Sequence, residues 1–206
     1  MPSTIIHLCI AKKINEKLKL DEQSLFLGSI APDISKHCNI SKMTTHFSKI
    51  INLDEPQIKL FYNKYQTKFN NPFIIGYFTH LIADDLWWKN INYHFFNKKT
   101  ITLKNNSIIE NKTETEITKL IYADYYSLNK KLIDNYQIEL SQLKNYNPKS
   151  INGIDELTFD QLPLLINNTF KIIDDSKEQD PLLIDLADIT KFINDCCNII
   201  IDSFNC

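Results

Sequence analysis

The segment from residue 71 to about residue 88 constrains the fold of this chain most, because it would be apolar nearly all round as a helix. It begins with Asn71-Pro72, and a proline at the first helical position is typical of a helix N-terminus. A helix that is hydrophobic on every side is stable only when other elements cover it. The sequence therefore predicts a buried central helix with the remaining elements packed around it.

Helical periodicity dominates the rest of the chain as well, and the 206 residues contain only three glycines. We expect further helices over residues 4–18, after Asp54-Glu-Pro56, over 113–143 as one helix or two, after a capping box at 158–161, and over 182–204. Residues 99–110 alternate around Asn105-Asn106 and predict a small β-hairpin. The length suits one domain, so the sequence predicts an all-α, multi-helix bundle over 1–206 as a single domain.

The N-terminal third contains several signals for where its elements begin and end. Ser3 or Thr4 is expected to cap the first helix. An apolar run over 25–33 is broken by Gly28 and stopped by Pro32, and a polar loop over 34–45 follows. The apolar run ends in Asp33, and the polar loop is followed by His46. Both side chains can bind a metal ion.

Composition and charge narrow the class of protein. The formal net charge is −2, and general nucleic-acid binders are usually strongly basic, so we expect no stable nucleic-acid complex. The N-terminus lacks the basic stretch and apolar core of a secretory signal, and no apolar run is long enough to span a bilayer, which favours a cytoplasmic protein without a transmembrane segment. The five cysteines are odd in number and scattered without a CxxC motif, so we expect reduced, buried thiols.

The chain contains no arginine. The guanidinium group of arginine is the side chain that binds phosphate in a bidentate manner. A phosphate-binding site in this chain therefore has to use metal ions, lysine or backbone amides.

His80 and Asp84 lie within the predicted central helix. Positions four apart share one helix face, so the two side chains project together, as nitrogen and oxygen ligands of a metal ion should. A buried carboxylate is costly unless it is paired or bound to metal. The alternative is a His–Asp hydrogen bond, or an aspartate at the solvated end of the helix. Gly76 lies one turn earlier on the same face, where the absence of a side chain lets another element approach closely.

Other histidines and acids strengthen the metal hypothesis. His7 falls on the inward stripe of the first helix, Asp33 ends the apolar run directly after a proline, and His46 follows the polar loop. Each residue by itself is more often structural, and a satisfied core histidine is the default for His7. As a set with His80 and Asp84 they favour a zinc-type site, because a metal centre requires clustered nitrogen and oxygen donors.

Four pieces of the sequence, in order, resemble the zinc-dependent phospholipase C family, whose fold is shared by secreted single-strand-specific nucleases. The pieces are an N-terminal histidine on a helix (His7), Leu27-Gly-Ser-Ile-Ala-Pro-Asp33, the Thr45-His46-Phe47 step, and Gly76-Tyr-x-x-His80-x-x-x-Asp84 with the tryptophans after it. Order and approximate spacing agree over about the first 90 residues, and the remaining chain matches only as generic helix. The resemblance implies an α-helical, phospholipase C-like bundle.

The resemblance also implies a set of metal ligands. One zinc ion would be bound by four side chains, those of Asp33, His46, His80 and Asp84. Asp84 would bridge to a second zinc ion that is also held by His7. In the secreted relatives the mature N-terminal residue completes this second site through its amino nitrogen and carbonyl oxygen. After removal of Met1, we expect Pro2 to take that part. The expected cofactor is therefore zinc, as two ions or as one.

The chain departs from the family at the third metal, which normally uses a histidine shortly after the bridging aspartate and a later His-x-x-x-acid pair. Here Asn90 stands at that position, and no histidine follows His94. The third site is expected to be absent, or rebuilt from other groups such as Asp85, His94 or Asp124. Trp87 and Trp88 are candidates for the wall of a substrate cleft, although at least one of them should pack in the core.

Two metal ions that share a carboxylate support hydrolysis by a metal-bound hydroxide, with Asp33 as the catalytic base. The leading hypothesis is therefore a metal-dependent hydrolase of phosphoesters that acts on a small-molecule or lipid-headgroup substrate. The resemblance alone favours a phosphodiester over a monoester. A metal-dependent amidase or esterase on the same scaffold stays open, because metal-bound hydroxide also attacks acyl carbons. A non-catalytic, zinc-stabilised binding protein stays open too, because four protein ligands can close a structural zinc site.

Overall fold

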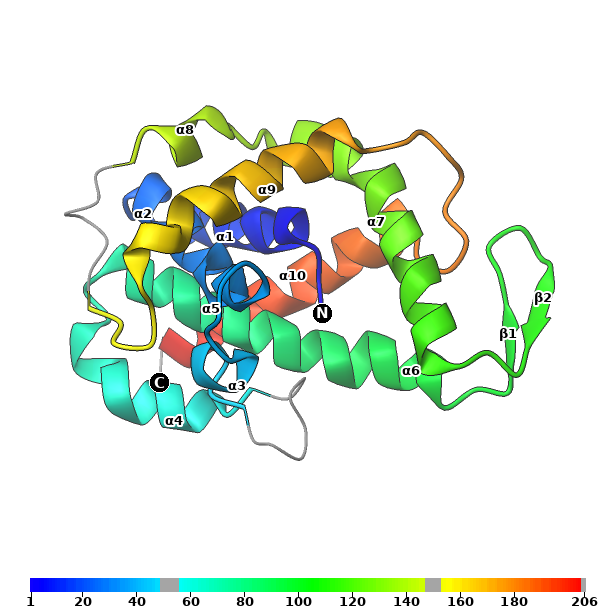
Figure 1. Ribbon diagram of the computed structural model, residues 1–206, viewed down its shortest axis with the longest axis horizontal. Helices are drawn as coiled ribbons and strands as arrows, with labels where there is room; N and C mark the ends of the chain where they lie inside the picture. Colours follow the sequence, from blue (N-terminus) through cyan, green and yellow to red (C-terminus); the bar gives the residue numbers. More distant parts are fainter. Residues whose placement is uncertain (49–55, 147–152, 205–206) are drawn as a thin grey trace.

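The computed structural model describes residues 1–48, 56–146 and 153–204 of the chain. Its helices surround α5, which runs through the middle of the molecule (Figure 1). The helices are α1 (Thr4–Leu18), α2 (Glu22–Ile30), α3 (Lys42–Thr45), α4 (Ile58–Tyr65), α5 (Pro72–Trp87), α6 (Tyr93–Phe96), α7 (Glu114–Tyr136), α8 (Ser141–Lys144), α9 (Leu162–Asp174) and α10 (Leu186–Phe204). Two short strands, β1 (Thr100–Thr102) and β2 (Ile108–Glu110), pair antiparallel in a hairpin at one end of the molecule. The prediction of an all-α fold with a small hairpin at 99–110 is confirmed.

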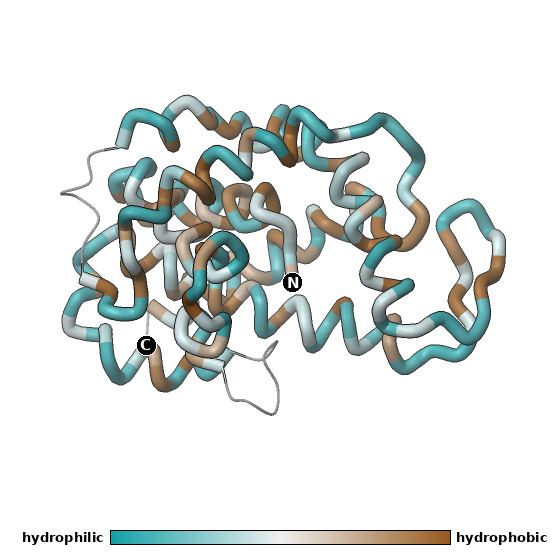
Figure 2. Tube along the Cα trace, in the orientation of Figure 1, coloured by the Kyte–Doolittle hydropathy of each residue, from teal (hydrophilic) through white to brown (hydrophobic). Residues whose placement is uncertain are grey.

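The central helix α5 is buried almost throughout, as the sequence predicts. Asn71 caps its N-terminus, because the side-chain oxygen accepts a hydrogen bond from the Phe73 backbone N–H at 2.9 Å. Apolar residues gather on the inward sides of the surrounding helices, and polar residues dominate the outer turns (Figure 2). Although α5 is so apolar, no helix within the described ranges combines the length and the apolar character that a membrane span requires.

Two glycines bring the backbones of α2 and α5 into direct contact. A Cβ atom at Gly76 would lie 2.2 Å from the Leu25 carbonyl oxygen, and one at Gly28 would lie 2.0 Å from the Phe73 carbonyl oxygen. The close approach predicted at Gly76 is therefore confirmed. The predicted break at Gly28 is wrong, because α2 continues through this residue and needs a glycine there only to lie against α5.

The ends of the other helices follow local hydrogen bonds. Ser3 caps α1, since its hydroxyl oxygen accepts the Ile6 N–H at 3.3 Å. The capping box predicted at 158–161 is wrong, because Thr158 makes no side-chain cap and a 3-10 turn leads into α9 instead. The last helix begins at Leu186, later than predicted, because the backbone N–H groups of residues 182–184 bind the carboxylate of Asp124.

Several remaining segments differ in detail from their predictions. The predicted loop over 34–45 is partly helical, since it contains the end of a 3-10 turn, Ala31–Lys36, and α3. Of the two alternatives predicted over 113–143, one helix or two, the structure has two: α7 ends before Gln137, where φ is 51°, and α8 begins at Ser141. In α4, Phe61 and Tyr65 are buried, whereas residues 54 and 55 before this helix lie outside the described residues. The single-domain organisation over 1–206 stays a prediction.

Replacing Gly76 with alanine is expected to destabilise the protein by about 2 kcal/mol or more, because the new methyl group would overlap the Leu25 carbonyl oxygen of α2. Urea-induced unfolding followed by circular dichroism measures the loss. Lys119→Ala on the exposed face of α7 is the control and should change stability by less than about 0.5 kcal/mol. Equal stability of the two variants would show that the two backbones do not touch at this point.

Candidate metal centre

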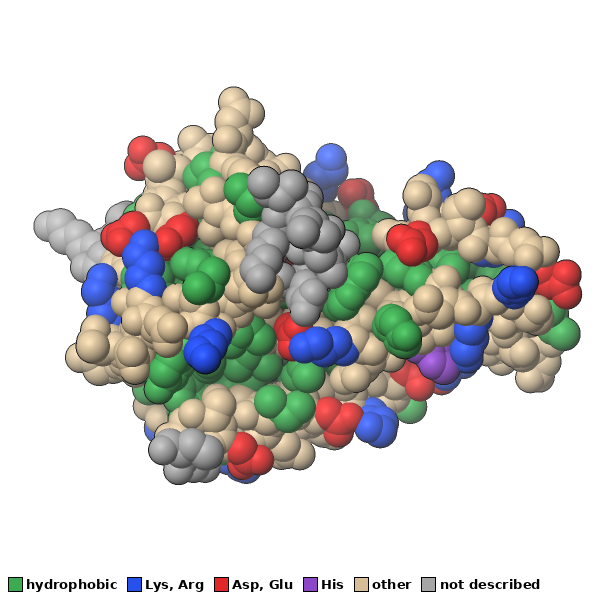
Figure 3. Space-filling model, turned by 90° about the horizontal axis from the view of Figure 1, so that it is seen from below, with side chains coloured by type: hydrophobic (Ala, Val, Ile, Leu, Met, Phe, Trp, Pro, Cys, Tyr) green, Lys and Arg blue, Asp and Glu red, His purple; other side chains and the backbone are tan. Residues whose placement is uncertain are grey.

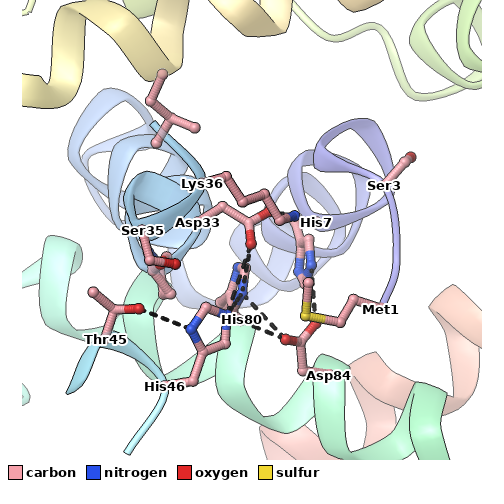
Figure 4. A network of polar contacts seen from close by, with 12 residues as sticks. Met1, Ser3, His7, Asp33, Ser35, Lys36, Thr45, His46, His80 and Asp84 are labelled. Carbon is pink, nitrogen blue, oxygen red and sulfur yellow. Dashed lines mark hydrogen bonds and ion pairs between the residues drawn. The ribbon is translucent and has the colours of Figure 1, made fainter. Parts of the chain in front are cut away.

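Five side chains from separate elements converge in the interior, and we refer to them as the His–Asp cluster. α1 contributes His7, the 3-10 turn after α2 contributes Asp33, the residue that ends α3 is His46, and α5 contributes His80 and Asp84. None of the five is more than 2% exposed, and histidine is scarcely visible on the molecular face in Figure 3. Figure 4 shows the side chains pointing toward one another. The structure thus brings together all five side chains that the sequence singled out as metal ligands.

Local structure aims each side chain at the common point. His80 and Asp84 are one helical turn apart on α5. The hydroxyl group of Tyr77, also on α5, donates a hydrogen bond to the Thr45 carbonyl oxygen and so ties the end of α3 to the central helix. The backbone contact between α2 and α5 carries the following 3-10 turn, with Asp33, to the same place.

Four donor atoms have the spacing of a tetrahedral metal site. The Nε2 atoms of His46 and His80 are 3.3 Å apart, and Asp84 Oδ2 lies 3.4 and 3.5 Å from them, respectively. Asp33 Oδ1 lies 3.7 Å from the first of these nitrogens and 4.0 Å from the second. A zinc ion about 2.0–2.1 Å from each of four tetrahedral ligands would separate those ligands by about 3.4 Å. The distances from the two histidine nitrogens to each other and to both carboxylates are therefore close to those of a zinc site.

Hydrogen bonds on the far side of each ring leave the Nε2 lone pairs free. His80 Nδ1 lies 2.8 Å from the Ser29 carbonyl oxygen and donates to it, because a carbonyl oxygen only accepts. The Thr45 hydroxyl group donates to the Lys42 carbonyl oxygen, so its own oxygen accepts from His46 Nδ1 at 2.9 Å. With Nδ1 as the donor of each ring, the neutral form of each imidazole carries its lone pair on Nε2, and these two Nε2 atoms lie 3.3 Å apart. A cation between them would relieve the repulsion of these lone pairs, and such outer contacts are what orients histidine ligands in metal sites.

The carboxylates support the same interpretation. Asp33 Oδ1 and both oxygens of Asp84 are buried and have no hydrogen-bond partner in the part of the chain that the structure describes. Their distances to the histidine nitrogens are 3.4 Å or more, which exceeds the roughly 2.8 Å of a charge-assisted hydrogen bond. Buried charged oxygens are normally paired. One or two cations in the cluster would satisfy these oxygens and the lone pairs together.

Asp84 is placed to serve two metal positions. Its Oδ2 faces His46 and His80, whereas its Oδ1 lies 3.4 Å from His7 Nε2. Neither ring nitrogen of His7 has a hydrogen-bond partner among the described residues. The His7 ring stacks on that of His80 with the centroids 3.8 Å apart. Two groups of donors result, and they share His80. One consists of His7, His80 and Asp84, the other of Asp33, His46 and His80, and the donor atoms within each group lie within 4.8 Å of one another.

Burial and mutual contacts set the ionisation of the cluster. Burial, followed by the charge of the stacked histidine, lowers the pKa of His7 to about 4, so this ring is neutral at neutral pH. Burial acts against the charged form of His46 as well, but the carboxylates of Asp33 and Asp84 beside it outweigh burial and raise its pKa. Burial also opposes ionisation of the two aspartates. The charge of Lys36 beside Asp33, and the histidines around Asp84, nevertheless hold both pKa values well below their usual range.

A cavity of about 230 Å³ borders the cluster at Asp33. The outer oxygen of this residue, Oδ2, forms an ion pair with Lys36 Nζ at 2.8 Å, and Figure 4 shows Lys36 lying across the cluster. The lining of the cavity includes Pro2, Asp33, Lys36, Tyr122, Tyr125 and Asn129. The sequence analysis missed Lys36 and the residues from α7. Tyr122, Tyr125 and Asn129 recur at helical spacing, which is a signal that could have placed them on one inward face.

None of the residues considered for a third metal site joins the cluster. Asp85 pairs with Lys89 at 2.8 Å, and His94 is exposed and contacts Lys98 at 2.9 Å. The Asp124 carboxylate accepts three backbone N–H groups at 2.7–2.9 Å, those of Leu182, Leu183 and Ile184. Within the described ranges, no group of potential metal ligands includes any of the three.

The two tryptophans have different surroundings. Trp87 cannot line a cleft, because its side chain is fully buried and packs edge-on against Phe192. The prediction of Trp87 as a cleft residue is wrong. Trp87 is instead the tryptophan that packs in the core, as was expected of at least one of the two. Trp88 is half-buried, packs edge-on against Phe96, and lines a separate hollow beside Met1.

The fold and the His–Asp cluster define a helical protein with a buried set of potential zinc ligands. Residues 1–179 match the family model for zinc dependent phospholipase C, and the chain therefore belongs to the zinc-dependent phospholipase C family. Neither curated proteins nor solved structures give a match. Family membership and the buried donor groups together support a metal-dependent phosphoester hydrolase at the level of the family, with zinc as its metal.

Replacing His80 with alanine is expected to abolish zinc binding, because this ring belongs to both donor groups. Elemental analysis of the wild-type protein, after removal of loosely bound metal, should give about two zinc ions per chain, and the variant close to none. His94→Ala is the matched control, since this histidine is exposed and lies outside the cluster. Equal zinc contents in the two variants would show that the cluster is not the metal site.

In protein freed of metal by a chelator, His7 is expected to reduce stability as the pH falls. Its pKa is about 4 in the folded protein against 6.5 in a model compound, so between these values the unfolded chain takes up a proton that the folded protein does not. This depressed pKa therefore costs stability below about pH 6.5 and has no effect well above it. Between pH 7 and pH 5 the wild type should lose about 2 kcal/mol more than His7→Gln. Urea unfolding at each pH measures this, and parallel pH profiles would contradict it.

Proposed function

We propose that this protein hydrolyses phosphoesters, and phosphodiesters in preference to monoesters, at the His–Asp cluster. The observation that carries the proposal is the placement of Asp84, whose two oxygens face different histidine nitrogens at 3.4 Å. Two zinc ions bound on either side of this carboxylate would acidify a water molecule and neutralise charge on the phosphoryl oxygens. The preference for a phosphodiester rests on membership of the family.

Asp33 is the proposed catalytic base. It borders the cavity, its Oδ1 is turned toward the histidines, and its Oδ2 is held by Lys36 at 2.8 Å. The ion pair fixes the orientation of the carboxylate, which is ionised because its pKa lies well below the usual range. A carboxylate of low pKa is a weak base, so Asp33 would suit the deprotonation of a water molecule made acidic by zinc, were zinc held in the cluster.

Pro2 is the proposed additional ligand, through its amino nitrogen and carbonyl oxygen after loss of Met1. Pro2 is buried and lines the same cavity as Asp33, and the Met1 carbonyl oxygen accepts a hydrogen bond from the hydroxyl group of Tyr125, another lining residue, at 2.8 Å. The short connection from Pro2 to His7 on α1 keeps the chain terminus close to the second metal position.

The proposed substrate is a small-molecule or lipid-headgroup phosphoester. The cavity of about 230 Å³ is smaller than the roughly 300–1,000 Å³ of most ligand pockets, which supports a compact reacting group. With a net charge of −2, we propose that the protein forms no stable nucleic-acid complex. A cytoplasmic location and a single domain over 1–206 complete the proposal.

A structural zinc protein is the second candidate, because four protein donors, from Asp33, His46, His80 and Asp84, are enough to close a tetrahedral zinc site. Such a protein would lose its fold with its metal and would hydrolyse nothing. An amidase or esterase would use the same donor set on an acyl substrate.

Replacing Asp33 with asparagine is expected to lower phosphodiester turnover by about 100-fold or more, because the base is lost. The zinc-loaded protein is assayed with bis(p-nitrophenyl) phosphate, p-nitrophenyl phosphate, p-nitrophenyl acetate and an anilide. Hydrolysis of the phosphodiester above the other three substrates is the expected result for the wild type and for the control His94→Ala.

Hydrolysis of the acetate or the anilide alone would replace the proposal with acyl chemistry. No hydrolysis, together with unfolding on zinc removal, would favour the structural candidate. Zinc analysis of Asp33→Asn separates loss of the base from loss of metal. Mass spectrometry of the active, fully metallated protein should find Pro2 as the first residue, and an intact Met1 would rule out Pro2 as a ligand.

A further inference from the structure

Asn129 on α7 has a buried amide group with unused hydrogen-bond donors. Its side chain is 1% exposed, and its Nδ2 has no hydrogen-bond partner within the described chain. Its Oδ1 accepts a hydrogen bond from the Ser3 hydroxyl group at 3.4 Å. The Ser3 oxygen itself accepts the Ile6 N–H at 3.3 Å, so its hydrogen is free for Asn129, which supports this orientation of the amide. A buried donor without a partner costs about 1–3 kcal/mol and is rare in native proteins unless a ligand uses it.

Lys36 lines the same cavity as Asn129 and is the only lysine among its described lining residues. One donor of its ammonium group is directed to Asp33 Oδ2 at 2.8 Å. An ammonium group has three donors, so up to two remain for a ligand. The chain has no arginine, and a lysine is therefore the side chain that can bring positive charge to a bound anion here.

The remaining lining of this cavity adds no net negative charge. Asp33 is the only carboxylate among the described lining residues, and Lys36 pairs with it. Tyr122, Tyr125 and Tyr126, all from α7, add aromatic lining to the cavity. The Lys36 ammonium group and the unpartnered Nδ2 of Asn129 thus offer donors in a cavity whose one described carboxylate is already paired, which matches an anionic group.

We propose that the Lys36 ammonium group and the Asn129 amide together bind the oxyanion of a compact phosphoester beside the His–Asp cluster. This inference rests on the proposed function and names two residues that hold its substrate. Asp85, His94 and Asp124 are all engaged away from the cluster, and the described chain has no third set of metal ligands. Lys36 and Asn129 would instead supply hydrogen bonds and positive charge to the substrate. Lys36 also positions Asp33, whereas Asn129 would give its Nδ2 donors to the ligand and keep its Oδ1 bonded to Ser3.

The test compares inorganic phosphate binding by zinc-loaded wild type, Lys36→Met and Asn129→Leu, using isothermal titration calorimetry. Removing the charged donor should weaken phosphate binding by about tenfold or more, and removing the amide by about fivefold. Lys12→Met is the matched control, because Lys12 forms a comparable ion pair with Glu22 at 2.8 Å and lies outside the cavity. Zinc content should be the same in all four proteins.

If Lys36 and Asn129 bind the oxyanion, the KM for the phosphodiester should rise in both Lys36→Met and Asn129→Leu. Lys36→Met should also lower kcat through Asp33, whereas Asn129→Leu should leave kcat close to that of the wild type. Thermal unfolding confirms that each variant is folded, and Asn129→Ser replaces Asn129→Leu if the larger side chain prevents folding.

Two outcomes would overturn the inference: a wild type that binds no phosphate at millimolar concentration, or Lys36 and Asn129 variants that bind it as tightly as Lys12→Met does. A wild type that binds phosphate through the pair but hydrolyses no phosphoester would end the proposed function and leave this oxyanion site standing. A wild type that hydrolyses the phosphodiester, with the same KM in both variants, would overturn the oxyanion site and leave the proposed function standing.

Discussion

Where α2 lies against α5, Gly28 and Gly76 leave no side chain between the two backbones. This contact brings the Ser29 carbonyl oxygen within 2.8 Å of His80 Nδ1, which fixes the tautomer of that ring. It also places the 3-10 turn that follows α2, and with it Asp33, beside the central helix. The metal centre therefore depends on a packing distance. With side chains at the two glycine positions, α2 would stand further from α5, and neither the Ser29 hydrogen bond nor the approach of Asp33 could persist.

The cluster places two ionised aspartates and three histidines in the core, which is the most expensive place for them. The surrounding chain offsets this cost only in part. Thr45 and Ser29 satisfy the outer nitrogens of two rings, and Lys36 satisfies the outer oxygen of Asp33. The inner atoms are left facing one another, so the folded chain has a strong electrostatic demand for cations at this point. Stability and metal binding are therefore coupled in this protein.

Residues that lie close in sequence, or on one helix, were predicted well. The spacing of His80 and Asp84 on an apolar helix follows from helix geometry alone, and so does the open face at Gly76. The errors at Gly28 and Asp124 arose because each of these residues acts through a distant partner. Gly28 is a helix breaker by propensity, but here α5 decides that it stays within α2. Asp124 was considered as a metal ligand, but it caps backbone groups some sixty residues further along the chain.

The sequence by itself determined the central helix, the helical class of the fold and the identity of the side chains that can bind metal, because periodicity and donor chemistry are local properties. Only the tertiary structure decided which oxygen of Asp84 faces which histidine, and that Lys36 and Asn129 share a cavity with Asp33. These relations join α1, α2, α3, α5 and α7, and no spacing along the chain encodes the distance between two helices. That distance is set by the side chains packed between them, and at Gly28 and Gly76 by their absence.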